Sequence, residues 1–295
     1  MEQGALGGLG VWSWVDHLPP GELAALAGRL EAWGYSALWV PEAIGRNPFA
    51  THGFLAGRTR TLMLATGIAN IYARDAMAMR SGAEAIQDLS EGRFALGIGV
   101  SHAPLVSAVR GHDYGKPVST MRAYLEAMEK APYPGAEARP SPPVLLAALR
   151  PRMLALAAES AQGAHPYNVT PEHTARAREI LGQGVLLCPE QKLLLETDAA
   201  KARAVARQNL AVYISLPNYQ NNWKWLGFDD ADFADGGSDR LIDAMVCWGD
   251  EDALRARIQE HRDAGADHVC IQPLRPDGAP GPDERALELL APAGA

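Results

Sequence analysis

The chain has 295 residues, of which 47% are hydrophobic and 21% are charged, and its formal net charge is -8 at pH 7. This composition is typical of a soluble globular protein with a large core, and the acidic balance argues against nucleic-acid or anionic-membrane binding. The 3 cysteines lie far apart and suggest neither a disulfide framework nor a zinc site. Because Met1–Gly10 lacks signal-peptide features and no apolar run approaches the ~20 residues of a membrane span, we expect a cytoplasmic protein.

Strand-like and helix-like segments alternate in the first part of the chain. Apolar residues recur at helical spacing from Leu23 to Trp33 and from Met77 to Leu89, and Gly34 ends the first of these helices. Short apolar runs predict strands at Leu9–Trp12, Ala37–Pro41, Leu62–Ala69 and Phe94–Gly99. Ala103–Val118 has mixed polarity, so we expect a loop there, and a loop of this length is more often functional than idle.

The alternation continues after a Pro-rich connection at Pro132–Pro142. Strands are predicted at Val144–Ala148, Gly163–Tyr167, Val185–Glu196 (broken or bulged by Pro189) and His268–Pro273. Helices are predicted around Met121–Met128, from Pro151, over Pro171–Leu181, from Asp198 to Val212, as a pair that ends at Gly265, and over Asp283–Leu290. The segment Leu216–Gly237 is rich in Asn, Trp and Asp and is predicted to be irregular.

These elements predict an α/β fold with a single domain over residues 1–295. Strands that are buried on both faces are continuous apolar runs, and parallel neighbours need long crossover connections. The simplest closure of eight such strands is a parallel (β/α)8 TIM barrel, with insertions after strands 4 and 7. A doubly wound sheet is the alternative.

The segment Glu91–His102, E-G-R-F-A-L-G-I-G-V-S-H, is typical of a helix end, a turn at Gly92, a strand and a glycine-rich exit. The carboxyl ends of strands are where α/β folds place their chemistry. Glycines at 97 and 99 would let the backbone approach a flat or charged ligand. Ser101 and His102 supply the reactive side chains at this exit, so we expect a ligand site here.

Five segments, in order, resemble the luciferase-like monooxygenase family. They are G-Y-S-A-L-W-V-P-E at 34–42, A-T-G-I-A-N-I-Y-A-R-D at 65–75, the motif at 91–102, P-P-V-L-L-A-A-L-R-P-R-M at 142–153 and A-G-A-D-H-V-C-I-Q at 264–272. Each is weakly specific alone, but together they extend over nearly the whole chain. The resemblance implies a (β/α)8 barrel that uses reduced FMN or the deazaflavin coenzyme F420. The segments L-P-N-Y-Q-N-N at 216–222 and V-S-H-A-P-L at 100–105 resemble the deazaflavin-dependent branch more than the bacterial luciferases.

The resemblance also implies which residues face the cofactor ring. Gly67-Ile68 matches the place where deazaflavin enzymes of this family carry a non-proline cis peptide, whose bulge supports the back of the ring; the alternative is an ordinary strand with a glycine bulge. The amide of Asn70 could hydrogen-bond the ring or the substrate, and Ser101 is a further candidate contact.

Two candidate catalytic residues follow from the same resemblance. His102 falls where related dehydrogenases place a catalytic acid, and its ordinary pKa suits proton transfer; a neutral donor to the ring and a half-buried structural histidine are the alternatives. Glu42 ends the second strand and is either an acid-base group or a structural carboxylate. The next residue is Ala43, where those dehydrogenases have a catalytic histidine, so their alcohol-oxidising mechanism is in doubt.

The start of the helix after strand five, Leu149-Arg150-Pro151, matches the turn that the family uses for the cofactor phosphate. Arg150 replaces the usual glycine, and its guanidinium could add a charge-assisted contact; if the backbone does not fit, phosphate affinity is weakened. Tyr167, at the exit of strand six, is a cofactor contact or a packing residue. Three aromatic residues in the irregular segment could line a substrate pocket, although such clusters more often pack: Trp223, Trp225 and Phe228.

Three hypotheses for the function remain open at this stage. The first is a coenzyme F420-dependent oxidoreductase that transfers a hydride between the deazaflavin and a small organic substrate. The second is an FMN-dependent two-component monooxygenase, and the third is a non-catalytic flavin- or deazaflavin-binding barrel. The histidine spacings predict no metal, the expected partner is a small-molecule substrate, and the resemblance implies a homodimer.

Overall fold

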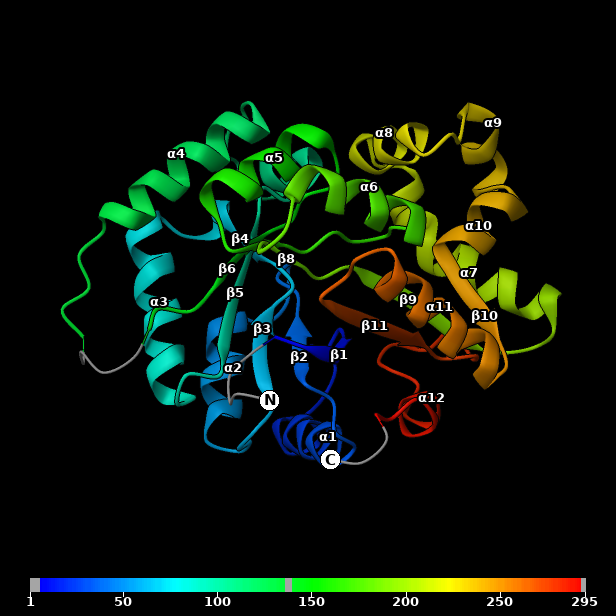
Figure 1. The fold of residues 1–295 in the computed structure, drawn as a ribbon, viewed down its shortest axis with the longest axis horizontal. Helices are drawn as coiled ribbons and strands as arrows, with labels where there is room; N and C mark the ends of the chain where they lie inside the picture. Colours follow the sequence, from blue (N-terminus) through cyan, green and yellow to red (C-terminus); the bar gives the residue numbers. More distant parts are fainter. Residues whose placement is uncertain (1–5, 136–139, 293–295) are drawn as a thin grey trace.

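The protein folds around a curled parallel sheet that is surrounded by helices (Figure 1). The structure is a computed structural model and describes residues 6–135 and 140–292. Residues 136–139 of the predicted Pro-rich connection therefore lie outside the described residues. The strands are β1 Gly8–Trp12, β2 Ala37–Val40, β3 Met63–Thr66, β4 Ala69–Asn70, β5 Phe94–Gly99, β6 Val144–Leu146, β7 Gly163–Ala164, β8 Leu186–Leu187, β9 Glu190–Leu195, β10 Val246–Gly249 and β11 His268–Leu274.

The sheet closes into the predicted (β/α)8 barrel. Neighbouring strands follow the order β10-β9-β11-β1-β2-β3-β5-β6-β7-β8, and every ladder between these described strands is parallel. The strands β8 and β9 are parts of one segment, interrupted at Cys188 and Pro189, and they pair with β7 and β11 respectively. Cys270 N donates to Pro189 O at 2.9 Å, so this segment joins the two ends of the sheet.

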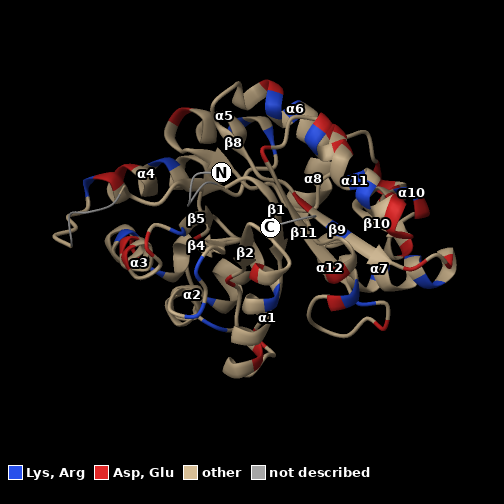
Figure 2. Cartoon of the chain, turned by 60° about the horizontal axis from the view of Figure 1, so that its bottom comes forward, with Lys and Arg blue, Asp and Glu red and all other residues tan. Residues whose placement is uncertain are grey.

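The helices cover the outside of the barrel, and most of the charged side chains lie on them (Figure 2). Several begin with proline in the first turn, and others with an Asx, Ser or Thr cap such as Asp198 on α7. Their bounds are α1 Pro20–Ala32, α2 Pro48–Ala56, α3 Ala76–Leu89, α4 Pro117–Lys130, α5 Pro151–Ser160, α6 Pro171–Leu181, α7 Ala199–Ile214, α8 Pro217–Trp225, α9 Asp230–Phe233, α10 Asp239–Met245, α11 Glu251–Asp263 and α12 Glu284–Leu289.

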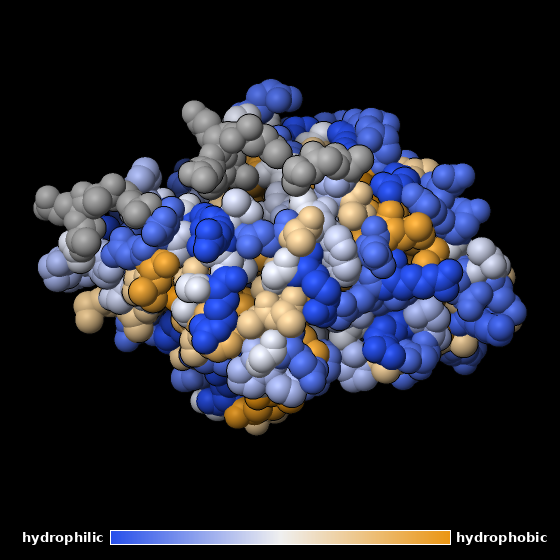
Figure 3. Space-filling view, turned by 90° about the horizontal axis from the view of Figure 1, so that it is seen from below, coloured by the Kyte–Doolittle hydropathy of each residue, from blue (hydrophilic) through white to orange (hydrophobic). Residues whose placement is uncertain are grey.

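The last helix, α12, returns to the first one. Arg29 on α1 forms a bidentate ion pair with Glu284, and the Tyr35 hydroxyl donates to Leu287 O at 2.7 Å. On this side the surface is mainly hydrophilic, with apolar residues in separate patches (Figure 3). The two ends of the described chain are thereby fixed to each other outside the barrel.

Two segments that we predicted to be irregular are helical. Within Ala103–Val118, a π-helix spans Pro104–Val109, and α4 already begins at Pro117. Within Leu216–Gly237, Pro217 starts α8, and Asp229 forms a capping box that starts α9. Polar and aromatic composition hid these helices because a first-turn proline or, for α9, a capping box marks where they begin, rather than a regular apolar stripe.

The predicted strands also need correction. β10 was not predicted, because its four residues follow α10 directly and carry no turn signal. The predicted strand Leu62–Ala69 is two strands, β3 and β4, separated by Gly67 and Ile68. The predicted strands Val144–Ala148 and Gly163–Tyr167 end earlier, at Leu146 and Ala164, and their last residues turn into the loops above the barrel.

Candidate functional site

A cavity of about 1270 Å³ opens at the carboxyl ends of the barrel strands. Its walls come from the segments that follow β1, β2, β3, β5, β6 and β7, and from α7 and α8. Of the predicted site residues, all but Asn70 line this cavity: Glu42, Gly67, Ile68, Ser101, His102, Leu149, Arg150 and Tyr167. Residues predicted from segments far apart in the sequence therefore meet at one place.

The peptide bond between Gly67 and Ile68 is cis, as predicted. Polar groups from neighbouring strands hold the carbonyls of both residues. Trp12 Nε1 donates to Gly67 O at 2.7 Å, and Glu42 N donates to Ile68 O at 3.1 Å. An added Cβ at Gly67 would lie 2.8 Å from Trp12 Nε1, so the indole leaves room only for glycine at this position.

Glycine occupies positions 97 and 99 of β5 for a different reason from the one we expected. An added Cβ at Gly97 would lie 2.1 Å from Thr66 O, and one at Gly99 would lie 2.8 Å from Ile68 Cδ1. Thr66 Oγ1 also donates to Gly97 O at 2.7 Å. Both glycines thus accommodate β3 and the Ile68 side chain, rather than a direct approach of the β5 backbone to a ligand.

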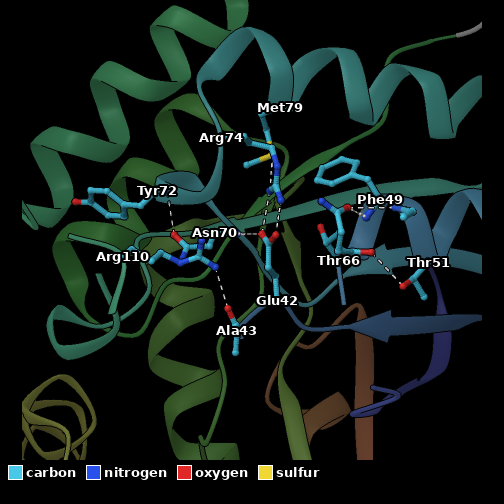
Figure 4. A network of polar contacts seen from close by, with 12 residues as sticks. Glu42, Ala43, Phe49, Thr51, Thr66, Asn70, Tyr72, Arg74, Met79 and Arg110 are labelled. Carbon is cyan, nitrogen blue, oxygen red and sulfur yellow. Dashed lines mark hydrogen bonds and ion pairs between the residues drawn. The ribbon is translucent and has the colours of Figure 1, made fainter. Parts of the chain in front are cut away.

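The carboxylate of Glu42 lies in a polar network behind the cavity wall (Figure 4). Its two oxygens accept hydrogen bonds from both terminal nitrogens of Arg74, and Oε2 also accepts a hydrogen bond from Asn70 N at 2.8 Å. The Asn70 side-chain oxygen accepts Tyr72 N at 2.9 Å, so Asn70 caps a short 3-10 helix instead of facing the cavity. These contacts suit the structural alternative for Glu42, because they tie the end of β2 to both sides of the Gly67-Ile68 bulge.

The exit of β5 presents Ser101 and His102 to the cavity. Ser101 has a positive φ of 57°, and its carbonyl accepts the Tyr114 hydroxyl at 3.0 Å. Burial lowers the pKa of His102, and Asn218 offsets part of this shift. Nδ1 of His102 is buried without a hydrogen-bond partner among the described residues, so one ring nitrogen at the cavity wall is unpaired.

Helix α5 begins at the edge of the cavity, where Leu149 and Arg150 were predicted to hold a phosphate. Pro151 has no N–H, and the N–H groups of Met153 and Leu154 both donate to Arg150 O. The N–H of Arg152 has no acceptor within residues 6–135 and 140–292. Arg150, Arg152 and Lys116 are exposed cations on this rim, so an anionic group would find both a helix start and positive charge here.

Tyr167 is half-buried in a polar and aromatic cluster. Its hydroxyl donates to Gln272 Oε1 at 3.0 Å and lies 3.0 Å from the Tyr213 hydroxyl. Below its ring, at 3.9 Å from the centroid, lies the ammonium of Lys192, which pairs with Glu190 at 3.0 Å. Both charged side chains are fully buried, so burial lowers the pKa of Lys192 and raises that of Glu190.

Several residues of the cavity wall were missed in the sequence. Trp12 and Trp14 follow the end of β1 at alternate positions, and Tyr213 and Tyr219 flank the turn between α7 and α8. The only signal for them was their place after a predicted strand and in a segment rich in aromatic residues. Of the aromatic residues that we did consider, Trp223 is fully buried and donates to Asn168 O at 3.1 Å, and Trp225 lines the cavity.

A profile of luciferase-like monooxygenases matches residues 4–268. The chain belongs to the luciferase-like monooxygenase family. A relative in this family is the 5,10-methylenetetrahydromethanopterin reductase of Methanolobus tindarius, with 26% identity over 321 residues. The alignment covers 94% of this chain and 96% of the reductase.

Solved structures agree with the barrel fold. The coenzyme F420-dependent tetrahydromethanopterin reductase of Methanopyrus kandleri superposes with a TM-score of 0.77 at 20% identity, covering 97% of this chain and 98% of that one. The oxygenating constituent of 3,6-diketocamphane monooxygenase of Pseudomonas putida, in complex with FMN, superposes with a TM-score of 0.71 at 14% identity, covering 97% of each chain. Similar folds in the luciferase-like family thus serve both cofactors.

The described residues form neither a membrane-spanning helix nor a metal-binding cluster. No helix among residues 6–135 and 140–292 is long and apolar enough to cross a membrane. The same residues contain no group of three or more His, Cys, Asp or Glu side chains that could hold a metal ion. The large cavity therefore remains the candidate site.

Proposed function

We propose that this member of the luciferase-like family is a coenzyme F420-dependent oxidoreductase that transfers a hydride between the deazaflavin and a small organic substrate. The observation that carries the proposal is that one cavity combines a helix start flanked by free cations with a wall of apolar and aromatic side chains. A phosphate-bearing cofactor with a flat ring needs both features. The full-length similarity to a reductase supports hydride transfer over oxygen insertion.

The residues present fit this cofactor. The N–H of Arg152 and the guanidinium of Arg150 would hold the phosphate, and the Gly67-Ile68 bulge, Ser101 and Tyr167 would contact the ring. When bound, the deazaflavin supplies or accepts the hydride. The chain's own part is to orient the ring, to exclude water with its aromatic wall, and to offer the free nitrogen of His102 to a polar group of the ligand.

Titration of the purified protein with oxidised coenzyme F420, followed by the fluorescence of the deazaflavin, tests this assignment. We expect binding at or below tens of micromolar, and about tenfold weaker binding for Arg150→Ala because a charge-assisted contact is lost. Arg285→Ala is the matched control, since Arg285 is also exposed but lies on α12, away from the cavity. No binding of F420 at tens of micromolar would reject the proposal.

The FMN-dependent alternative separates from this proposal by its reaction with oxygen. Oxygen consumption that requires reduced FMN and a flavin reductase would favour the monooxygenase. A third outcome, tight F420 binding with no turnover and no effect of His102→Ala beyond affinity, would favour the non-catalytic barrel. The homodimer and the cytoplasmic location stay predictions, and sedimentation of the purified protein tests the former.

A further inference from the structure

A continuous arc of aromatic rings lines one side of the cavity. From Trp14 it passes to Trp12 at 5.5 Å between ring centroids, and then to Tyr167 at 5.0 Å. It continues to Tyr213 at 5.5 Å and from there to Tyr219 at 5.2 Å. His102 closes the arc, with its ring 5.5 Å from that of Tyr219. All six residues line the cavity, and we call this set the aromatic arc.

The aromatic arc lies apart from the residues that would hold the cofactor phosphate. Its tryptophans follow β1, Tyr167 follows β7, and the other two tyrosines belong to α7 and α8. Most of the candidate cofactor residues follow β3, β5 and β6 instead. In the closed barrel only the β8/β9 segment and β11 separate β7 from β1, so the tryptophans and Tyr167 come from neighbouring parts of the mouth. The arc meets the ring-contacting side at Trp12, which donates to Gly67 O, at Tyr167, and at His102, which follows β5. Space therefore remains for a second molecule beside the cofactor.

The hydroxyl protons of two of the three tyrosines in the arc, Tyr167 and Tyr213, are already engaged. Tyr167 gives its single proton to Gln272 Oε1, so the contact of 3.0 Å between the two tyrosine hydroxyls requires Tyr213 as the donor. Burial raises the pKa of Tyr213 to about 12, and that of Tyr167 further, so both phenols are neutral. The arc therefore offers ring faces and edges to a ligand rather than strong hydrogen-bond donors.

Among the described residues, no unpaired charge lies on this side either. Lys192 and Glu190 lie behind the arc, fully buried and paired with each other, and Lys224 on α8 pairs with Asp230 at 2.5 Å. The free cations of the cavity rim lie on the segment before α4 and at the start of α5, on the phosphate side. A carboxylate or phosphate placed against the tryptophans and tyrosines of the arc would lose its water without gaining an unpaired cation.

We propose that the aromatic arc is the substrate compartment and that it selects neutral, planar, conjugated carbonyl compounds. This rests on the proposed function and names its substrate class. Flat conjugated molecules stack on aromatic faces, and the conjugated carbonyl makes the β-carbon an acceptor for hydride. The hydride forms the new C–H bond at that carbon, the π electrons move to the carbonyl oxygen, and a proton from water completes the saturated product while the reduced deazaflavin is oxidised.

The test compares two ligands with the same styryl skeleton and different charge. Benzylideneacetone is a neutral planar enone, and trans-cinnamate carries a carboxylate in its place. Their binding is measured by quenching of tryptophan fluorescence, with and without coenzyme F420. We expect benzylideneacetone to bind at least about tenfold more tightly than cinnamate.

A matched pair of valine variants and one tyrosine variant locate the binding. Val212 lines the cavity beside the arc and is 59% exposed, whereas Val109 is 67% exposed and does not line the cavity. Both tolerate a charge without unfolding, so Val212→Glu should weaken benzylideneacetone binding about tenfold and Val109→Glu should not change it. Tyr219→Leu should weaken the enone to a similar degree and leave the affinity for F420 within about twofold.

The outcomes separate the two proposals. Equal or tighter binding of cinnamate, or the same effect from both valine variants, would overturn the substrate compartment. Binding of F420 without binding of benzylideneacetone would overturn it as well. Binding of benzylideneacetone without binding of F420 would support the compartment and reject the proposed cofactor.

Discussion

The pairing of Glu42 with Arg74 gives a quantitative prediction for the substitution Glu42→Gln. The two side chains are 7% and 12% exposed, and the carboxylate accepts both terminal nitrogens of Arg74 as well as Asn70 N. A glutamine has only one carbonyl oxygen, and its NH₂ group would face a guanidinium donor. The variant keeps the shape of the side chain but removes the charge and at least one hydrogen bond.

The expected cost is about 2–3 kcal/mol of unfolding free energy. Breaking a buried ion pair by removing one partner costs about 3–5 kcal/mol, and we take a lower value because Arg74 reaches some water and packs on Phe49. Urea unfolding at pH 7.5 measures the change. The matched control is Glu284→Gln, which also faces an arginine in two hydrogen bonds but is 46% exposed, and it should cost less than about 1 kcal/mol.

The same variant separates the two roles considered for Glu42. If the carboxylate holds the Gly67-Ile68 bulge, Glu42→Gln lowers both stability and F420 affinity, and adding Arg74→Gln restores part of the stability. Equal losses for the variant and for Glu284→Gln would refute this reasoning. Lost turnover with unchanged stability and affinity would instead identify Glu42 as an acid-base group.

Three further predictions follow from packing and charge. Gly67→Ala should cost about 1–3 kcal/mol in urea unfolding, because its Cβ would lie 2.8 Å from Trp12 Nε1, whereas Gly28→Ala, with open space in α1, should be neutral or stabilising. Lys192→Met should lower the free energy of unfolding by about 3–5 kcal/mol, and the double variant with Glu190→Gln should lower it by less. A Lys192→Met variant more stable than the unsubstituted protein would contradict this. Four buried histidines have a pKa of about 4, below the unfolded value of about 6.5, so the unfolded state binds more protons between these values and stability falls as the pH falls through this window. These histidines are His52, His165, His173 and His268. Each should lower the free energy of unfolding by about 1 kcal/mol between pH 7 and 5.5, and an unchanged urea midpoint would refute this prediction.

The barrel could be predicted from the sequence because its strands are buried on both faces. Runs such as Phe94–Gly99 are apolar throughout, and their spacing leaves room for a helix between neighbours. The predictions failed where tertiary contacts rather than periodicity define the element. β10 is stabilised by its ladder with β9, and α8 packs through Trp223, neither of which a local pattern records.

The candidate site could be predicted only in part, for a related reason. Segments that resemble the family identified Gly67, His102 and Arg150, which follow strands of the barrel and do line the cavity. The aromatic arc could not be predicted, because its residues come from β1, β7 and the α7–α8 turn, and their meeting depends on how the barrel closes. The partners of Glu42 were missed as well, since Arg74 lies on a separate segment that no local pattern links to it.

The titratable groups of the cavity also bear on which reaction fits. Among its described lining residues, the carboxylates and histidines are Glu42, His102 and His165. Glu42 is ion-paired, and burial lowers the pKa of His102 and takes that of His165 to about 4. Where related dehydrogenases have a catalytic histidine, the carbonyl of Ala43 instead accepts Arg110 Nη2 at 2.8 Å. Oxidation of an alcohol needs a base beside the hydroxyl, whereas reduction of a conjugated carbonyl can take its proton from water. The loss of the histidine therefore favours the reductive direction and the substrate class that the aromatic arc would accept.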